Sequence, residues 1–373
     1  LCNGLATGSA TVVATGGSNV TYAWSPSGGT AATASNLTAG TYTCTITNGD
    51  GTVLTRTVTI TQPSALTAST AQTNVLIYGN TTGAATVYTS GGTSPYTYAW
   101  SSLSATTSSV SNLAAGSYTC TITDANGCSI TKSFTITQPV ILAASTSSTN
   151  VSCNSGENGS ATISVTGGVT PYLYVWTPNV STGATASNLA YGTYSCTVTD
   201  ANGATLTRSF TITQPTALTA TTSQVNILCN SATTGSASVV VSGGTSGYTY
   251  AWSPSGGTAA TASNLAAGTY SCLITDANGC TITKSFTITQ PSQLTASTSQ
   301  TNVAINGTST GVASVTVAGG VTGYTYAWSP SGGTNATASN LAAGSYTCTI
   351  TDANGCSITK TFSITQPSAM VAS

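Results

Sequence analysis

Cysteine is the residue type of this chain with the widest chemistry, because a thiol can form a disulfide, bind a metal or act as a nucleophile. The 373 residues include eleven cysteines, an odd number, so at least one is unpaired or bonds to another chain. Histidine is absent, which excludes Ser-His-Asp and Cys-His catalytic devices. No Cys-x-x-Cys spacing occurs, and the sequence therefore predicts no metal site and no cofactor.

The acidic residues offer little further chemistry. Six are present: Asp50, Glu157 and four aspartates in one recurring turn, Asp124, Asp200, Asp276 and Asp352. One aspartate per turn cannot provide the carboxylate pair of a glycoside hydrolase, and it supplies too few oxygen ligands for calcium. We therefore predict that these aspartates form turns, that there are no catalytic residues and that the protein is not an enzyme.

These residues recur with a period of 76 positions, which indicates a tandem repeat. Gln-Pro closes each unit, first at Gln62-Pro63 and last at Gln366-Pro367. One tryptophan follows the same period: Trp24, Trp100, Trp176, Trp252 and Trp328. So does the tyrosine of a Tyr-x-Cys motif: Tyr42, Tyr118, Tyr194, Tyr270 and Tyr346. The predicted units are repeat 1 (1–63, which lacks the first strand), repeat 2 (64–139), repeat 3 (140–215), repeat 4 (216–291) and repeat 5 (292–367), followed by the start of a further first strand (368–373).

Each unit has the residue pattern of an all-β domain. In repeat 2 we expect strands at 66–75, 83–92, 96–100, 118–123 and 128–137, with short edge strands within 101–111. A tryptophan on a middle strand, followed by a Leu-x-x-Gly-x-Tyr-x-Cys corner, is typical of immunoglobulin (Ig) sandwiches. The sequence thus predicts five Ig-like β-sandwiches in tandem, although Tyr-x-Cys also fits any alternating strand.

The Asp124-Ala125-Asn126-Gly127 turn predicts a hairpin in which Cys120 lies opposite a lysine, Lys132. Every repeat has one such cation pointing inward on its last strand: Arg56, Lys132, Arg208, Lys284 and Lys360. A charge that points inward on an edge strand blocks association between sheets, while its stem covers apolar surface and its head reaches water or a carbonyl. An isopeptide bond is the less favoured alternative, because arginine cannot form one.

The cysteines occupy three positions of the repeat. The early position holds Cys2, Cys153 and Cys229, with Ile77 and Ile305 in the other repeats. The middle position, in Tyr-x-Cys, is always cysteine: Cys44, Cys120, Cys196, Cys272 and Cys348. The late position holds Cys128, Cys280 and Cys356, with Thr52 and Ala204 in the others.

Disulfide pairing can be tested against the predicted hairpin. Cys120 and Cys128 would lie roughly 13 Å apart along it, too far for a disulfide. Early-to-middle pairing fits an Ig sandwich and predicts Cys2–Cys44, Cys153–Cys196 and Cys229–Cys272. Cys120, Cys128, Cys280, Cys348 and Cys356 would then be free or unresolved. The alternative is that all eleven are small buried hydrophobic residues.

Composition narrows the range of partners. Only 3% of the residues are charged and the net charge is −1, so no basic surface for nucleic acid or anionic lipid is expected. No apolar run is long enough for membrane insertion. No signal peptide opens the chain, and it starts and stops within the repeat phase, so we expect a fragment or a processed product.

The stretches YTCTITDANGCSITKSFTITQPSAL, GGxxxYxYxWS and CNSGENGSAT resemble the SprB repeat, found in very large surface adhesins of gliding Bacteroidota. The resemblance implies an extracellular, cell-surface protein of the type IX secretion route, with a role in gliding motility or attachment. We accordingly expect a structural stalk or filament segment whose partner is another repeat or filament neighbour. One alternative is a filament subunit joined by strand donation, and another is a module that binds glycan or a substratum through Thr-rich faces.

Overall fold

The computed structural model describes residues 1–371, and every regular element in that part of the chain is a β-strand. Within those residues no helix has the length and apolarity needed to cross a membrane. Repeat 1 contains β1 Gly8–Thr11, β2 Thr21–Ser25, β3 Thr33–Leu37, β4 Gly40–Thr47 and β5 Val53–Ile60. Repeat 2 contains β6 Thr67–Thr73, β7 Gly83–Ser90, β8 Thr97–Trp100, β9 Ser109–Leu113, β10 Gly116–Thr123 and β11 Ser129–Ile136.

The remaining repeats follow the same order. Repeat 3 contains β12 Ala143–Thr149, β13 Gly159–Thr166, β14 Leu173–Thr177, β15 Thr185–Leu189, β16 Gly192–Thr199 and β17 Thr205–Ile212. Repeat 4 contains β18 Thr219–Val225, β19 Gly235–Ser242, β20 Thr249–Ser253, β21 Thr261–Leu265, β22 Gly268–Thr275 and β23 Thr281–Ile288. Repeat 5 contains β24 Thr295–Thr301, β25 Gly311–Ala318, β26 Thr325–Ser329, β27 Thr337–Leu341, β28 Gly344–Thr351 and β29 Ser357–Ile364. No strand is assigned at 368–371, and the rest of the predicted 368–373 strand lies outside the described residues.

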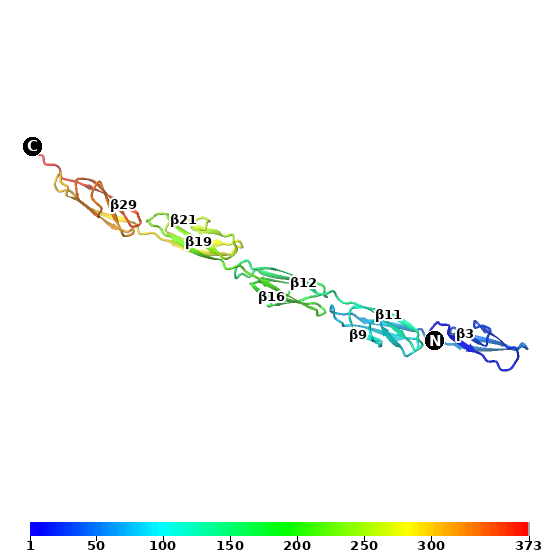
Figure 1. Cartoon of the computed structure of the whole chain (residues 1–373). Helices are drawn as coiled ribbons and strands as arrows, with labels where there is room; N and C mark the ends of the chain where they lie inside the picture. Colours follow the sequence, from blue (N-terminus) through cyan, green and yellow to red (C-terminus); the bar gives the residue numbers. More distant parts are fainter. Residues whose placement is uncertain (372–373) are drawn as a thin grey trace. The chain divides into compact units, whose positions relative to one another are not determined.

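Each six-stranded repeat divides into two antiparallel sheets with Ig connectivity. In repeat 4 the sheets have the orders β18-β19-β21 and β20-β22-β23. In Ig terms these are strands A-B-E and C-F-G, so the Ig-like sandwich prediction is confirmed. Figure 1 shows β19 and β21 side by side in this repeat, as their pairing requires. In repeat 1 the first of the two sheets has only β1 and β3.

The predicted hairpin register is also confirmed. In repeat 2, β10 and β11 pair so that Tyr118 lies opposite Phe134, and Cys120 lies opposite Lys132. The strand that carries the cation is at the edge of its sheet, in the order β11-β10-β8. Alternation fixes this register, because a slip of one residue would move the whole apolar row to the solvent face.

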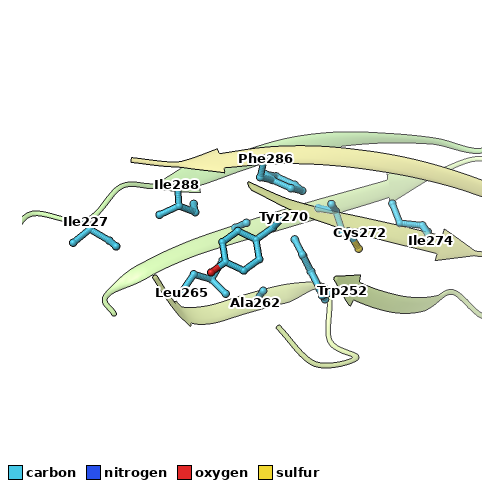
Figure 2. Packing of buried hydrophobic residues seen from close by; sticks show 11 residues of the cluster. Ile227, Trp252, Ala262, Leu265, Tyr270, Cys272, Ile274, Phe286 and Ile288 are labelled. Carbon is cyan, nitrogen blue, oxygen red and sulfur yellow. The ribbon is translucent and has the colours of Figure 1, made fainter. Parts of the chain in front are cut away.

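The tryptophan and the middle cysteine share the core of each sandwich. Trp252 pairs with Cys272 across β20 and β22, and Phe286 of β23 lies 5.2 Å from the indole, measured between ring centroids. Figure 2 shows these side chains directed into one cluster with Ile274 and Leu265. The indole Nε1 donates to the Ala259 carbonyl at 2.8 Å, so the polar atom of the ring is satisfied inside the core.

The tyrosine corner is formed as predicted. Tyr270 donates from its hydroxyl to the Ala266 carbonyl at 3.1 Å, four residues upstream. Tyr42, Tyr118 and Tyr346 make the same bond to Thr38, Ala114 and Ala342. The bond fixes the loop between the two sheets to the strand that carries the middle cysteine.

Separate buried clusters form in repeats 1, 2, 4 and 5, so each of these sandwiches has its own core. Backbone contacts group the chain differently, into two compact units. The first holds Leu1–Ser147, Thr162–Ala186 and Tyr194–Ser209, and the second holds Ser148–Ala161, Ser187–Thr193 and the chain from Phe210 onward. Every contact between repeats described below lies inside one of these units. The five-domain boundaries remain a prediction.

Candidate functional site at the repeat junctions

The chemically distinctive residues gather where one repeat meets the next. We call this place a junction and define it by three segments, exemplified between repeats 4 and 5. The first is the loop 226–234, which lies between β18 and β19 and holds the early position. The second is the Gln290-Pro291 link, and the third is the hairpin turn 352–356 of the following repeat.

The early loop is fastened to the end of its own repeat. Asn230 donates from Nδ2 to the Pro291 carbonyl at 2.9 Å, and the Ser231 amide donates to Gln290 Oε1 at 2.8 Å. The glutamine bond recurs in every repeat. The asparagine bond recurs in repeats 1, 3 and 5, for example from Asn3 to Pro63 at 3.0 Å, whereas repeat 2 has Tyr78 at that position. The conserved geometry gives Gln-Pro a role that the sequence did not reveal: its glutamine holds the early loop against the last strand.

The hairpin turn of the following repeat is organised by its aspartate. Asp352 Oδ1 accepts the amides of Asn354 and Cys356 at 3.0 and 2.9 Å, while Oδ2 accepts the Val321 amide at 3.0 Å. The last bond ties the turn to the loop after β25. The turn-forming role predicted for this residue is therefore accompanied by a second one, because the carboxylate joins two loops at the same end of the sandwich.

A glycine pair allows this close approach. In repeat 2, Gly91 and Gly92 have φ of 70° and 63°, in the left-handed region that favours glycine. A Cβ on Gly91 would lie 1.9 Å from the Ala65 carbonyl oxygen, and one on Gly92 would lie 2.9 Å from Asp124 Oδ2. Side chains at these two positions would separate the hairpin from the incoming link.

Contacts cross the junction at the asparagine and the late cysteine. Asn354 donates from Nδ2 to the Leu228 carbonyl of the preceding repeat at 2.9 Å. Beside it, Cys356 forms a disulfide with Cys229. The other two disulfides are Cys2–Cys128 and Cys153–Cys280. Each therefore joins the early position of one repeat to the late position of the next.

The early-to-middle disulfide prediction is wrong for all three pairs, Cys2–Cys44, Cys153–Cys196 and Cys229–Cys272. The physical reason is orientation. The middle cysteine points into the core beneath the tryptophan, and Cys272 is fully buried there. The early cysteine lies in a loop at the end of the sandwich and faces the neighbouring repeat. Strand B, β19, has no cysteine to pair with the one on strand F: its core position is the small residue Ala237.

One junction lacks a disulfide, and both of its cysteine positions are changed together. Ile77 holds the early position of repeat 2 and Ala204 the late position of repeat 3. The hydrogen bond remains, since Asn202 donates from Nδ2 to the Leu76 carbonyl at 2.8 Å. The absence of both cysteines from this one junction was a signal in the sequence that could have predicted the connectivity. Every early cysteine has a late cysteine about 126 residues further along the chain, and Ile77 has none.

The five middle cysteines are the free ones, and all are buried. Cys128, Cys280 and Cys356, expected to be free or unresolved, are disulfide-bonded, whereas Cys120 and Cys348 are free as expected. Burial raises the pKa of each middle thiol, an effect that a backbone hydrogen bond partly offsets at Cys120 and Cys272. A buried protonated thiol is a poor nucleophile.

We expect native, oxidised protein to resist thiol alkylation at all eleven cysteines. Unfolding in denaturant without reductant should expose five reactive thiols, and denaturation with reductant should expose eleven. Intact-mass measurement after iodoacetamide treatment counts the adducts, and non-reducing peptide maps identify the pairs. Recovery of a Cys229–Cys272 peptide would contradict the connectivity described here.

The aspartate turns predict a loss of stability in acid. At Asp276 the Thr245 amide is the main cause of a lowered pKa, assisted by the Cys280 and Asn278 amides and opposed by burial. The folded state thus binds a proton less readily than the unfolded state. This stabilisation is present above the ordinary aspartate pKa of 3.8 and is lost as the pH falls through the lowered value.

We therefore expect the midpoint temperature of thermal unfolding of repeats 2–5 to decrease as the pH is lowered from 5 to 2, roughly the range of ordinary and lowered carboxyl pKa values. Circular dichroism can follow the transition. The variant Asp276→Asn imitates repeat 1, which has Asn48 at this position, and should make repeat 4 less sensitive to pH. An unchanged pH profile in that variant would argue against the turn as the titrating element.

The edge-strand cations make few contacts in the described chain. Arg208 donates from Nε to the Ala144 carbonyl of β12 at 3.4 Å and from a terminal nitrogen to Thr207 at 3.2 Å. Arg56 donates to the Thr55 carbonyl at 3.1 Å. Lys284 and Lys360 occupy the corresponding register, opposite the middle cysteines of their repeats. The predicted protective role of these five residues remains a prediction.

The junctions also have shallow hollows, of about 470 Å³ beside Cys229–Cys356 and about 440 Å³ beside Cys153–Cys280. Among residues 1–371 no three His, Cys, Asp or Glu side chains gather in a way that could hold a metal ion. The chemistry of the junction is therefore that of its disulfide, supported by the hydrogen bonds of the asparagine and aspartate.

Comparison with solved structures returns chains of several Ig domains. The N-terminal eight Ig domains of Down Syndrome Cell Adhesion Molecule isoform 1.30.30 match at 11% identity and a TM-score of 0.31, covering 98% of this chain and 71% of that one. Immunoglobulin domains 1–5 of Sidekick-1 match at 12% identity and a TM-score of 0.28, covering 96% and 94%. The Ig assignment rests on the strand order and the tyrosine corner described above.

A search of curated proteins finds no match. The family model for the SprB repeat matches three segments, residues 69–105, 145–181 and 221–258. These segments begin within the first strands of repeats 2, 3 and 4 and run past the tryptophan. The family resemblance noted in the sequence is thereby confirmed for these segments, and the chain is an array of Ig-like sandwiches in which three segments match the SprB repeat.

Proposed function

We propose that this chain is a stalk segment of an extracellular, cell-surface adhesin. The observation that carries the proposal is the junction, where successive sandwiches are joined by an asparagine hydrogen bond and, at three of the four junctions, by a disulfide. A structural element of this kind holds domains in series. Disulfides persist in oxidising surroundings, which favours an extracellular location.

The SprB repeats support the adhesin class, and we propose gliding motility or attachment as the process served, with export by the type IX route. Partners in this proposal are further repeats, filament neighbours and a surface glycan or substratum. The edge-strand cations would keep neighbouring, nearly identical sandwiches from pairing through their exposed strands.

Extension in solution tests the stalk proposal. A strand of about ten residues with its link adds roughly 35–40 Å per repeat, so five repeats in series should span about 175–200 Å. Small-angle X-ray scattering gives the maximum dimension, and rotary-shadowed images give the particle shape. Compact particles much shorter than this would contradict the proposal. Antibody labelling of intact producing cells, with lysed cells as the control, tests the surface location.

A second candidate function, filament assembly by strand donation, is favoured by a specific feature of repeat 1. Its β1-β3 sheet lacks a first strand, and a cavity of about 500 Å³ opens there among Val12, Ala14 and Ile46. In repeat 5, Leu294, which directly precedes the first strand β24, is buried. Met370 is its counterpart one period later and is fully exposed. The segment around Met370 of one copy would complete repeat 1 of the next.

Sedimentation of the intact chain over a range of concentrations tests this candidate. Strand donation predicts assemblies that grow with concentration and are lost in Met370→Asp, because a charge would then enter the apolar cavity. The matched control is Leu76→Asp, which changes an exposed residue outside the cavity. A monomer at all concentrations would exclude assembly and leave the stalk proposal intact.

A further inference from the structure

We propose that the inter-repeat disulfides are mechanical bypasses, which carry tension past the folded sandwiches and limit how far the chain can extend. The inference rests on the proposed stalk function, because only a tether is pulled along its length. It follows from covalent connectivity: a force applied to the chain ends travels along the shortest covalent path, and each disulfide shortens that path.

The first bypass covers nearly two repeats. Cys2 and Cys128 are separated by 126 residues of sequence, yet the disulfide places their Cα atoms 5.8 Å apart. All strands from β1 to β10 lie inside this loop. Tension that enters at Leu1 therefore passes through the Cys2–Cys128 bond to β11, and the loop between the two cysteines cannot lengthen while the bond is intact.

The other two bypasses overlap. Cys229 lies within the loop closed by Cys153–Cys280, and Cys280 lies within the loop closed by Cys229–Cys356. Three stretches of backbone, 153–229, 229–280 and 280–356, thus run between the same two linkages. The shortest, 229–280, sets the limit of extension, and the other two are slack when it is taut. Repeat 4 contributes a cysteine to both linkages and is held by its neighbours on both sides.

The part of the chain that can lengthen is consequently small. It consists of residues 1–2, 128–153, 229–280 and 356–373, about a quarter of the sequence. At about 3.5 Å per residue, full extension reaches roughly 330 Å with the disulfides intact and roughly 1,300 Å without them. The stretch 128–153 contains β11, the Gln138-Pro139 link and β12, and no disulfide spans it, so it carries the load without a bypass.

Single-molecule pulling of the whole chain by its two ends tests the proposal. Full extension should increase about fourfold when dithiothreitol is added. Each protein disulfide then takes up two electrons and two protons to give two thiols, and dithiothreitol is oxidised to its cyclic disulfide. Equal extension before and after reduction would overturn the proposal, as would an oxidised chain that reaches the length of the reduced one.

A variant with one bypass removed gives the matched measurement. Cys2→Ser with Cys128→Ser releases the loop between these positions and should add about 440 Å to the oxidised extension, at about 3.5 Å per residue. Cys120→Ala, which removes a free thiol, should add nothing. The length at full extension depends on covalent connectivity even in an unfolded molecule. It can therefore still be interpreted if a variant misfolds. A compact particle in scattering would reject the stalk, while a fourfold change on reduction would still uphold the bypasses.

Discussion

Trp252→Ala is expected to destabilise repeat 4 by about 3–5 kcal/mol, the cost of removing a large aromatic side chain from a packed core. The indole contacts Phe286 and Cys272, and its Nε1 satisfies the Ala259 carbonyl. Since small domains have only about 5–15 kcal/mol of stability, this loss would leave repeat 4 close to unfolding. Hydrogen exchange resolved by peptide measures the effect repeat by repeat.

Two comparisons make this experiment decisive. Trp252→Phe keeps a ring in the core and should cost less than the alanine substitution, although it removes the bond to Ala259. Repeat 1, which shares no junction with repeat 4, serves as the internal control and should keep its protection. If exchange rose equally in all five repeats, the sandwiches would not have independent cores.

Cys229→Ser with Cys356→Ser is expected to lower the free energy of unfolding of repeats 4 and 5 by up to about 4–5 kcal/mol. The disulfide closes a loop of 127 residues, and a loop of this size restricts the unfolded chain strongly in the chain-entropy account. Urea unfolding followed by exchange mass spectrometry measures the change. The bond from Asn354 to Leu228 remains in the variant and should keep the junction formed in the native state.

The corresponding variant at the first junction, Cys2→Ser with Cys128→Ser, is the control for position. It should weaken repeats 1 and 2 and leave repeat 5 unchanged. The junction between repeats 2 and 3 serves as a reference, because Ile77 and Ala204 stand where the other junctions have the two disulfide cysteines. If repeat 4 unfolded at the same urea concentration with and without Cys229–Cys356, the disulfide would contribute nothing to equilibrium stability.

Local patterns allowed much of the sandwich to be predicted. Alternation set the register of Cys120 against Lys132, and the turn Asp124–Gly127 fixed where the hairpin reverses. The tyrosine corner followed from the spacing of Tyr118 and the middle cysteine. Each of these features depends on residues within a few positions of one another, or on neighbouring strands, and such short-range constraints can be read from one sequence.

The disulfides depend on how one sandwich meets the next, which the period does not specify. The Ig precedent favoured pairing within a sandwich, and it failed because strand B has Ala237 in its core and no cysteine. The role of Gln290 was missed for a related reason: the residues it holds, Ser231 and the early loop, lie about 59 positions away. The joint replacement of two cysteines by Ile77 and Ala204 was visible in the sequence. It indicates which positions of neighbouring repeats meet, which the sequence of a single repeat cannot show.

The pairing of early and late positions restricts how such an array can grow by gene duplication. Repeat 4 has cysteine at both positions, so in a tandem copy of it every early and late cysteine would find a partner. A copied repeat 2 would place Cys128 beside Ile77, and a copied repeat 3 would place Cys153 beside Ala204, each leaving an orphan thiol open to oxidation or to cross-linking with another molecule. Selection on lengthening genes should therefore favour units of the repeat 4 type, or units with neither cysteine.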